Sequence, residues 1–153
     1  MTQHKITPFL WFDTQAEEAA KFYVSIFPRS KIVSTMPGPG GTTMGLTFEL
    51  DGQTIMALNG GPHYKLTPAC SLYVSCDTQE EIDAYWEKLS DGGKITMCGW
   101  LDDRFGLTWQ IIPSVLSSLI GDSDRKAAGR AMDAMMKMKK LVIADLEKAY
   151  AGK

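Results

Sequence analysis

Few side chains of this sequence could act as nucleophiles or general bases. Cys98 is a conceivable nucleophile, but no histidine lies near it in sequence to activate the thiol, and a free cysteine is commonly a buried apolar residue. The two histidines, His4 and His63, lie near the N-terminus and in a loop rich in glycine, where we expect both to be exposed. The sequence therefore assigns no catalytic residue and leaves open whether the protein is an enzyme.

Asp103 and Arg104 are an adjacent acid and base that precede the predicted turn Phe105-Gly106. Such a pair commonly lies on the surface and contributes little to stability. If Arg104 instead faced the mouth of a cavity, its guanidinium would suit an anionic substrate. Both alternatives are open on the sequence.

The composition is that of an ordinary globular protein. Of the 153 residues, 44% are hydrophobic, enough for a core, and the formal net charge of −2 provides no basic field for nucleic acid or anionic lipid. The three cysteines are an odd number, which argues against a disulfide framework. We find no signal-peptide pattern and no apolar run of membrane-spanning length, so we expect a cytoplasmic protein that binds neither nucleic acid nor membranes.

The chain contains an internal repeat. An apolar run at Phe9–Phe12 is followed by Asp13-Thr14-Gln15, and a second run at Leu72–Cys76 is followed by Asp77-Thr78-Gln79. In both copies a threonine stands three residues before a glutamate, which predicts a capping box at the start of a helix. Apolar residues then recur at helical spacing. They are Ala16, Ala19, Ala20, Tyr23 and Phe27 in the first copy, and Ile82, Tyr85, Trp86 and Leu89 in the second.

Strand-like runs follow each predicted helix, so that each copy reads as βαβββ. The runs are 31–36, 43–50 and 53–58 in the first copy, and 94–98, 100–102 and 107–112 in the second. Asp51-Gly52 is a strong hairpin signal, and the Pro-Gly-Pro-Gly-Gly segment at 37–41 predicts a flexible loop.

Tandem βαβββ modules are typical of the glyoxalase, bleomycin-resistance and extradiol-dioxygenase superfamily, also called the vicinal oxygen chelate (VOC) superfamily. The chain resembles its PhnB-like branch over nearly its whole length. The motifs that carry the resemblance are Leu10–Asp13, Ala16–Tyr23, Leu58–Pro62, Cys98–Leu101, Asp103–Gly106, Trp109–Pro113 and Met138–Lys140. The resemblance implies an α+β fold in which the modules form an open, mostly antiparallel barrel around a pocket. We expect a single glyoxalase-like domain over 1–153, with module one at 1–66, module two at 67–113 and a helical tail at 114–153.

The resemblance also implies where a metal would be bound. Glyoxalase-type members hold a divalent metal with His or Gln and Glu ligands from both modules. The matching positions here are Ile6 or Pro8, Met56, Cys70 or Leu72, and Gln110. None is His or Glu, and Cys70 and Gln110 alone do not make a hard-cation site. We therefore expect neither a metal nor another cofactor.

Eight residues are candidates for contact with a ligand in the implied pocket. Gln110 stands at a ligand position, so its amide is expected to point into the cavity or to make a structural hydrogen bond. Trp11 and Trp100 offer flat apolar surface, or belong to the core. Asn59 precedes two glycines and either reaches a ligand or forms a turn with positive φ. The remaining candidates are Met56, Cys98, Asp103 and Arg104.

The sequence of the tail, 114–153, predicts two helices, one capped by Ser123 or Asp124 and one after Leu141. Its methionines suit packing against the domain or a second subunit, and a lid over the pocket is the alternative. We expect a homodimer, since two-fold dimers are the commonest oligomers and this superfamily often completes its cavities at subunit contacts.

The leading hypothesis is a metal-free small-molecule binding protein with an unknown ligand. The alternative is an enzyme of the VOC superfamily that uses the same pocket, such as a lyase, an isomerase or a dioxygenase-like protein. Members of the PhnB-like branch are often labelled demethylubiquinone methyltransferase. A site for S-adenosylmethionine needs a glycine-rich turn between a strand and a helix, which is not found here.

Overall fold

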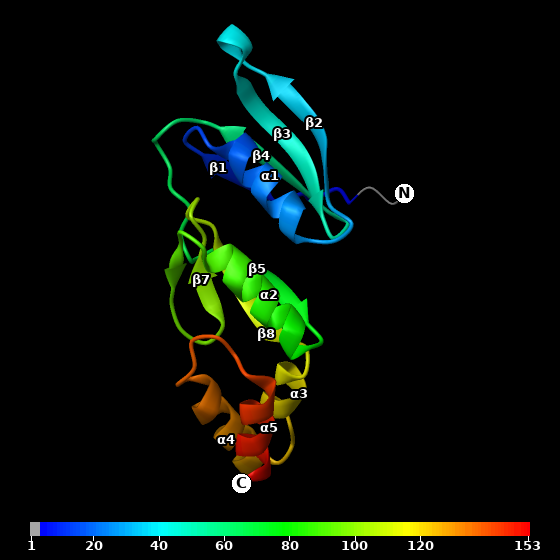
Figure 1. Cartoon of the computed structure of the whole chain (residues 1–153), viewed down its shortest axis with the longest axis vertical. Helices are drawn as coiled ribbons and strands as arrows, with labels where there is room; N and C mark the ends of the chain where they lie inside the picture. The colour runs from blue at the N-terminus through cyan, green and yellow to red at the C-terminus, as the bar shows by residue number, and fades with distance from the viewer. Residues whose placement is uncertain (1–3) are drawn as a thin grey trace. The chain divides into compact units, whose positions relative to one another are not determined.

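A computed structural model describes residues 4–153 of the chain. Two compact units are distinguished, the first ending at Leu66 and the second spanning Thr67–Lys153. Each unit contains its own four-stranded sheet with one helix across it (Figure 1). The α+β class and the tandem arrangement of modules are as predicted.

Module one is the first unit. Its elements are β1 (Phe9–Phe12), α1 (Ala16–Ile26), β2 (Lys31–Pro37), the 3-10 turn η1 (Pro39–Gly41), β3 (Thr43–Leu50) and β4 (Gln53–Asn59). The strand order is β1-β4-β3-β2, with β1 parallel to β4 and the other neighbours antiparallel. Asp51 and Gly52 both have positive φ, as the predicted tight hairpin between β3 and β4 requires.

The core of module one lies between α1 and one face of the sheet. Alternate strand residues point toward the helix, which is why the apolar residues of β3 and β4 are buried at every second position. On the helix, four side chains at helical spacing are fully buried: Ala16, Ala19, Ala20 and Tyr23. The small alanines let α1 approach the sheet closely, and the Tyr23 ring lies 6.3 Å from that of Phe48.

Module two repeats this plan. Its elements are β5 (Ser71–Cys76), α2 (Gln79–Ser90), β6 (Lys94–Ile95), β7 (Trp100–Asp102) and β8 (Thr108–Pro113). The strand order is β5-β8-β7-β6, with β5 parallel to β8. Strand β6 is shorter than predicted, because Cys98 has a φ of 59° and Gly99 a φ of 82°, and these left-handed residues turn the chain away from the sheet.

One of the two predicted capping boxes is present. Thr78 accepts the N–H of Glu81, and Glu81 accepts the N–H of Thr78 in return. The prediction for Thr14 and Glu17 is wrong, because α1 begins at Ala16 and the Ala16 N–H donates to Asn59 Oδ1 of β4 instead. A side chain from the sheet thus replaces the local cap.

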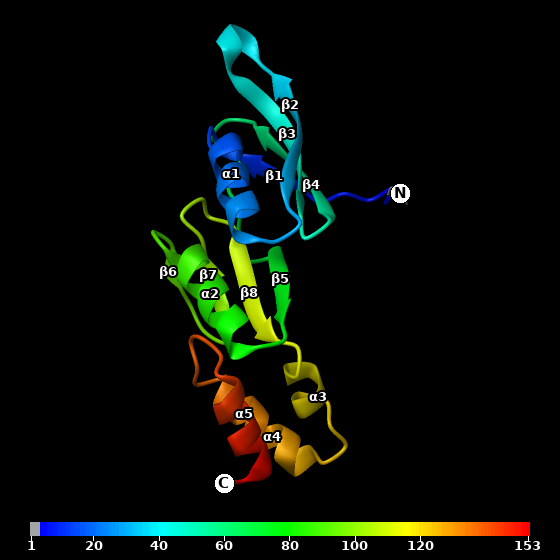
Figure 2. The ribbon, with the colours of Figure 1, turned by 45° about the vertical axis from the view of Figure 1, so that its right-hand side comes forward.

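The two sheets are separate in their strand pairing and are not closed into one barrel. After β8 the chain forms a tail of three helices, α3 (Leu116–Ile120), α4 (Arg125–Met135) and α5 (Ile143–Ala151), shown from two directions in Figures 1 and 2. Asp124 caps α4 as predicted, while α3 was not predicted. The tail packs on module two through a buried cluster of Ile112, Leu116, Leu141 and Leu146.

Within residues 4–153, no helix is both long enough and apolar enough to cross a membrane.

Candidate functional site

The face of the sheet opposite α1 carries apolar side chains in module one. Phe9 and Met56 are register partners on the parallel strands β1 and β4, and they are 55% and 37% exposed. Trp11 and Leu58 are the next partners on this face and are partly buried. We call this surface the helix-free face of module one.

Trp11 is fixed by the loop that follows β4. Its Nε1 donates to the Gly61 carbonyl oxygen at 2.9 Å, and its ring meets Tyr64 edge-on with centroids 5.0 Å apart. A Cβ at Gly60 would lie 2.2 Å from the indole, so this position needs glycine. The ring is therefore a rigid element of the face, and its contact with a ligand stays a prediction.

The helix-free face of module two is more polar. Trp100, Gln110 and Tyr73 are register partners across β7, β8 and β5, and Tyr73 is 58% exposed. The amide of Gln110 donates to Ser71 Oγ at 2.9 Å, which orients it along the sheet and leaves its oxygen as an acceptor. Both predicted roles of Gln110 thus remain compatible with its position.

Met56 and Gln110 occupy equivalent places in the two modules. The alignment that matches Asp13 with Asp77 also matches Phe9 with Tyr73, and these two residues are the register partners of Met56 and Gln110. The equivalence found in the sequence is therefore present in the hydrogen-bonded register of the sheets.

The donor set does not suit a divalent metal. Met56 and Gln110 supply a thioether and a carboxamide where the superfamily uses imidazole and carboxylate. Over residues 4–153, no three His, Cys, Asp or Glu side chains lie close enough together to hold one ion. The residues present do not fit the metal that the superfamily implies, so we derive no step through a metal.

Asp103 and Arg104 follow β7 and make different contacts. Asp103 is buried, with an exposed fraction of 4%, and accepts N–H groups of Phe105, Leu107 and Trp109 at 2.8, 3.1 and 2.8 Å. Arg104 forms an ion pair with Asp91, with Nη2 2.8 Å from Oδ2. The expectation that Asp103 lies on the surface is therefore wrong, because the turn between β7 and β8 folds around its carboxylate.

Cys98 lies where the tail docks on module two. Its N–H donates to the Met138 carbonyl oxygen at 2.8 Å, and its Sγ lies 3.8 Å from Met136 Sδ. The thiol thus faces a thioether. Gly99 makes the neighbouring contact, donating to the Lys139 carbonyl oxygen at 2.7 Å.

Asn59 links three elements of module one. Its Oδ1 accepts the Ala16 N–H at 2.8 Å, and its Nδ2 donates to the Thr43 carbonyl oxygen at 2.9 Å. The predicted alternative of positive φ at Asn59 is wrong, since that conformation is found at Gly61 instead.

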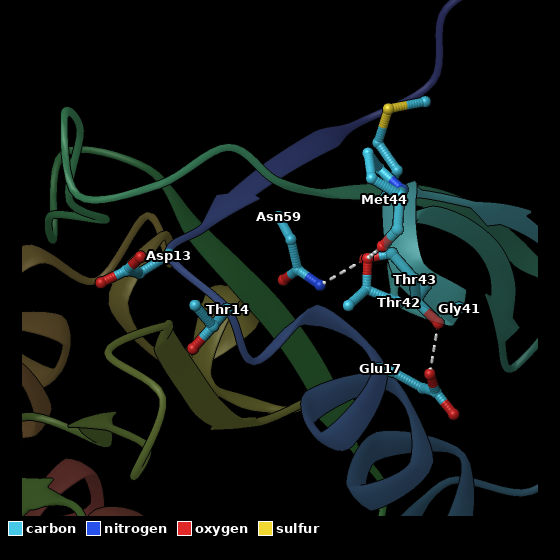
Figure 3. A pocket seen from close by; sticks show the side chains of 9 residues that line it. Asp13, Thr14, Glu17, Gly41, Thr42, Thr43, Met44 and Asn59 are labelled. Carbon is cyan, nitrogen blue, oxygen red and sulfur yellow. Dashed lines mark hydrogen bonds between the residues drawn. The ribbon is translucent and has the colours of Figure 1, made fainter.

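Asn59 also lines an open pocket of about 520 Å³ within module one. Figure 3 shows Asp13 and Thr14 on one side of Asn59 and Thr42, Thr43 and Met44 on the other, with Glu17 reaching Thr43 from α1. The nine lining residues are Asp13, Thr14, Glu17, Pro39, Gly41, Thr42, Thr43, Met44 and Asn59.

Eight of these nine residues were not predicted to belong to a site. Asp13, Thr14 and Glu17 had been interpreted as a helix start, and 37–41 as a flexible loop. The available signal was the repeat itself. Only the first copy has an asparagine, Asn59, at the end of its last strand, and this side chain caps α1 in place of Glu17.

Comparison with known proteins identifies the family. The family model described as 3-demethylubiquinone-9 3-methyltransferase matches residues 4–112. A PhnB protein from Bacillus cereus is 40% identical, covers 72% of this chain and 99% of its own, and superposes with a TM-score of 0.68. No curated protein matches the chain.

Two further solved structures share the fold at low identity. Protein PA1353 from Pseudomonas aeruginosa is 20% identical with a TM-score of 0.62, covering 72% of this chain and 98% of its own. The fosfomycin resistance protein FosX from Listeria monocytogenes, in complex with Mn(II), is 13% identical with a TM-score of 0.53, covering 71% and 90%. The chain thus has the VOC fold and belongs to the PhnB-like family whose model is described as 3-demethylubiquinone-9 3-methyltransferase.

Proposed function

We propose that the protein binds small organic molecules, without a metal, on the helix-free face of each module taken by itself. The observation that carries this proposal is the equivalence of the pairs Phe9–Met56 and Tyr73–Gln110. Exposed apolar and aromatic side chains that gather on one face of a sheet indicate a binding surface. On module two, the rings of Tyr73 and Trp100 would contact the apolar part of a ligand, and the Gln110 amide oxygen would accept one hydrogen bond from it.

The roles of the candidate residues differ in this proposal. The side chains of Trp100, Met56 and Trp11 provide apolar surface for contact with a ligand, and Gln110 orients a ligand by a hydrogen bond. Asp103, Arg104, Cys98 and Asn59 act through the backbone segments that they hold, since each has the protein contacts given above.

A titration with 8-anilinonaphthalene-1-sulfonate, an aromatic anionic probe, tests the face. Trp100→Phe is expected to weaken binding about fivefold, because the larger indole surface is lost. The matched control is Trp86→Phe, which changes a buried tryptophan of α2 on the other side of the sheet. Equal effects of the two substitutions, or no saturable binding, would count against the helix-free face as the site.

Metal analysis tests the metal-free part independently. Protein purified without chelator is incubated with Mn²⁺, Zn²⁺ and Ni²⁺ and then dialysed, and retention well below one ion per chain is expected. Near-stoichiometric retention would overturn the proposal and favour a VOC-type enzyme.

The family description favours a second candidate, methyl transfer. The turns between strand and helix argue against methyl transfer. The turn before α1 and the turn before α2 both begin with Asp-Thr and contain no glycine, so a nucleoside cannot approach the backbone closely there. Calorimetry with S-adenosylmethionine decides the matter, and micromolar affinity would support the methyltransferase.

We also propose that the protein acts as a cytoplasmic homodimer. Exposed apolar side chains on β2 and β3, namely Val33, Met36 and Met44, support self-association. Light scattering after size exclusion is expected to give twice the chain mass of 16.9 kDa, and a monomer at micromolar concentration would contradict it.

A further inference from the structure

The pocket of module one is distinct from the helix-free face. Its volume of about 520 Å³ lies within the range of small-ligand sites. Neither Phe9, Trp11 nor Met56 lines it. The pocket is therefore a second candidate binding site, separate from the helix-free face.

The two copies of the module use the same residues differently at this place. In module two, Glu81 accepts the N–H groups of Asp77 and Thr78 and closes the start of α2. In module one, Asn59 caps α1, and Glu17 instead binds Thr43 and Lys21. The sequence Asp-Thr-Gln-x-Glu thus serves a structural role in one copy and lines a pocket in the other.

Three of the side-chain donors in the pocket bind acceptors of the protein itself. The Thr42 hydroxyl donates to the Pro39 carbonyl oxygen at 2.8 Å, the Thr43 hydroxyl donates to Glu17, and the Asn59 amide donates to Thr43. Each hydroxyl retains acceptor lone pairs. Within the described part of the chain, the side chains of Asp13 and Thr14 have no hydrogen-bond partner. The pocket therefore presents chiefly acceptors to a ligand.

The charge of the lining residues also favours a ligand that donates hydrogen bonds. Asp13 and Glu17 are acidic, and none of the nine lining residues is basic. The hydrogen bonds from Lys21 and Thr43 lower the pKa of Glu17, which keeps its carboxylate ionised. Lys21 offsets the charge of Glu17 from outside the lining, so Asp13 is the principal attraction for a cation. Asp13 is exposed at the rim and points outward in Figure 3, and an exposed side chain changes rotamer rapidly.

We propose that this pocket binds a small organic ammonium ion that also carries hydroxyl groups, as an amino sugar does. The ammonium group donates to the carboxylate of Asp13, and the ligand hydroxyls donate to the free lone pairs of Thr14, Thr42 and Thr43. Pro39 and Met44 provide the apolar surface against which the carbon skeleton packs. This site is additional to the one proposed on the helix-free faces.

The test is an NMR titration of the isotope-labelled full chain with D-glucosamine, and with D-glucose as the neutral analogue. Saturable shifts of the backbone amides of Thr14, Gly41 and Thr42 are expected with glucosamine, and weaker ones with glucose. Asp13→Asn is expected to weaken glucosamine binding about fivefold, because a charge-assisted hydrogen bond is lost. The matched control is Asp77→Asn, which removes the same charge at the equivalent position of module two.

Equal binding of the two sugars, equal effects of Asp13→Asn and Asp77→Asn, or no shifts in the pocket up to the solubility of the probe would each overturn the proposal. Trp100→Phe is expected to leave glucosamine binding unchanged. Failure at this pocket is thereby distinguished from failure at the helix-free faces.

Discussion

Asn59 Oδ1 on strand β4 accepts the N–H of Ala16, the first residue of helix α1, at 2.8 Å. The same side chain donates to the Thr43 carbonyl oxygen at the start of β3. One carboxamide therefore sets the position of the helix relative to two strands. In module two the corresponding helix is capped by its own residues, so its start does not depend on the sheet in this way.

Asn59→Ala is expected to lower the free energy of unfolding by about 2 kcal/mol, because it removes a helix cap and a second hydrogen bond together. The matched control is Thr78→Ala, which removes one cap hydrogen bond and should cost about 1 kcal/mol. Urea denaturation measures both. A cost for Asn59→Ala no larger than that for Thr78→Ala would show that the link to β3 contributes nothing.

Asp103→Ala is expected to destabilise module two by about 3 kcal/mol, since three N–H donors lose their acceptor, including the buried indole of Trp109. Arg104→Ala next to it should cost below about 1 kcal/mol, because its ion pair with Asp91 is exposed. Thermal unfolding followed by tryptophan fluorescence compares them. Similar costs for both would contradict a structural role for the Asp103 carboxylate.

Burial raises the pKa of the Cys76 thiol to about 12, with Glu81 and Asp77 adding to the effect. The folded chain thus keeps a proton that an unfolded thiol, with an ordinary pKa near 9, releases. Stability therefore decreases as the pH rises from about 9 toward 12. Cys76→Ala is expected to reduce this decrease, because alanine has no ionisable group and, unlike serine, buries no hydroxyl.

Denaturation at a series of pH values between 8 and 11 provides the measurement for Cys76. Cys70, by contrast, is exposed. Iodoacetamide is expected to modify Cys70 well before Cys76. Rapid alkylation of Cys76 in the folded protein would show that the thiol is not buried.

Gln79→Ala is expected to loosen the tail. The Gln79 side chain donates to the Leu141 carbonyl oxygen at 3.1 Å and accepts the Ile143 N–H at 2.9 Å, so it binds the chain at the start of α5. Hydrogen exchange of segment 141–151 should accelerate about tenfold, which corresponds to roughly 1.4 kcal/mol. Gln15→Ala, at the equivalent position of module one, serves as the control. Unchanged exchange after Gln79→Ala would mean that the tail is held without the Gln79 hydrogen bonds.

The parts of the fold that depend on local pattern were predictable from the sequence. Strands β1, β3 and β7 have the predicted bounds, since alternation and the Asp51-Gly52 turn act over a few residues. The repeat also led to the equivalent positions of Met56 and Gln110, because a duplicated module keeps its register. The PhnB-like resemblance was likewise confirmed.

The parts that depend on distant partners were not predictable. Thr14 and Glu17 satisfy the capping-box pattern in the sequence. The capping box does not form because Asn59, at the end of β4, accepts the N–H at the start of α1. Asp103 looks like a surface residue in the sequence, and its burial follows from the fold of a turn around its carboxylate. The pocket is formed by contacts between residues that are distant in sequence, which is why most of its residues were not predicted.

Besides its buried side chains, the tail contacts module two through main-chain hydrogen bonds. Cys98 and Gly99 hold it by backbone N–H groups, and the acceptors on Met138, Lys139 and Leu141 are carbonyl oxygens. The matched family model ends at residue 112, just where this tail begins. A main-chain hydrogen bond does not depend on which side chain its residue carries. Substitutions at Met138 and Lys139 that keep the backbone path therefore leave these two hydrogen bonds in place.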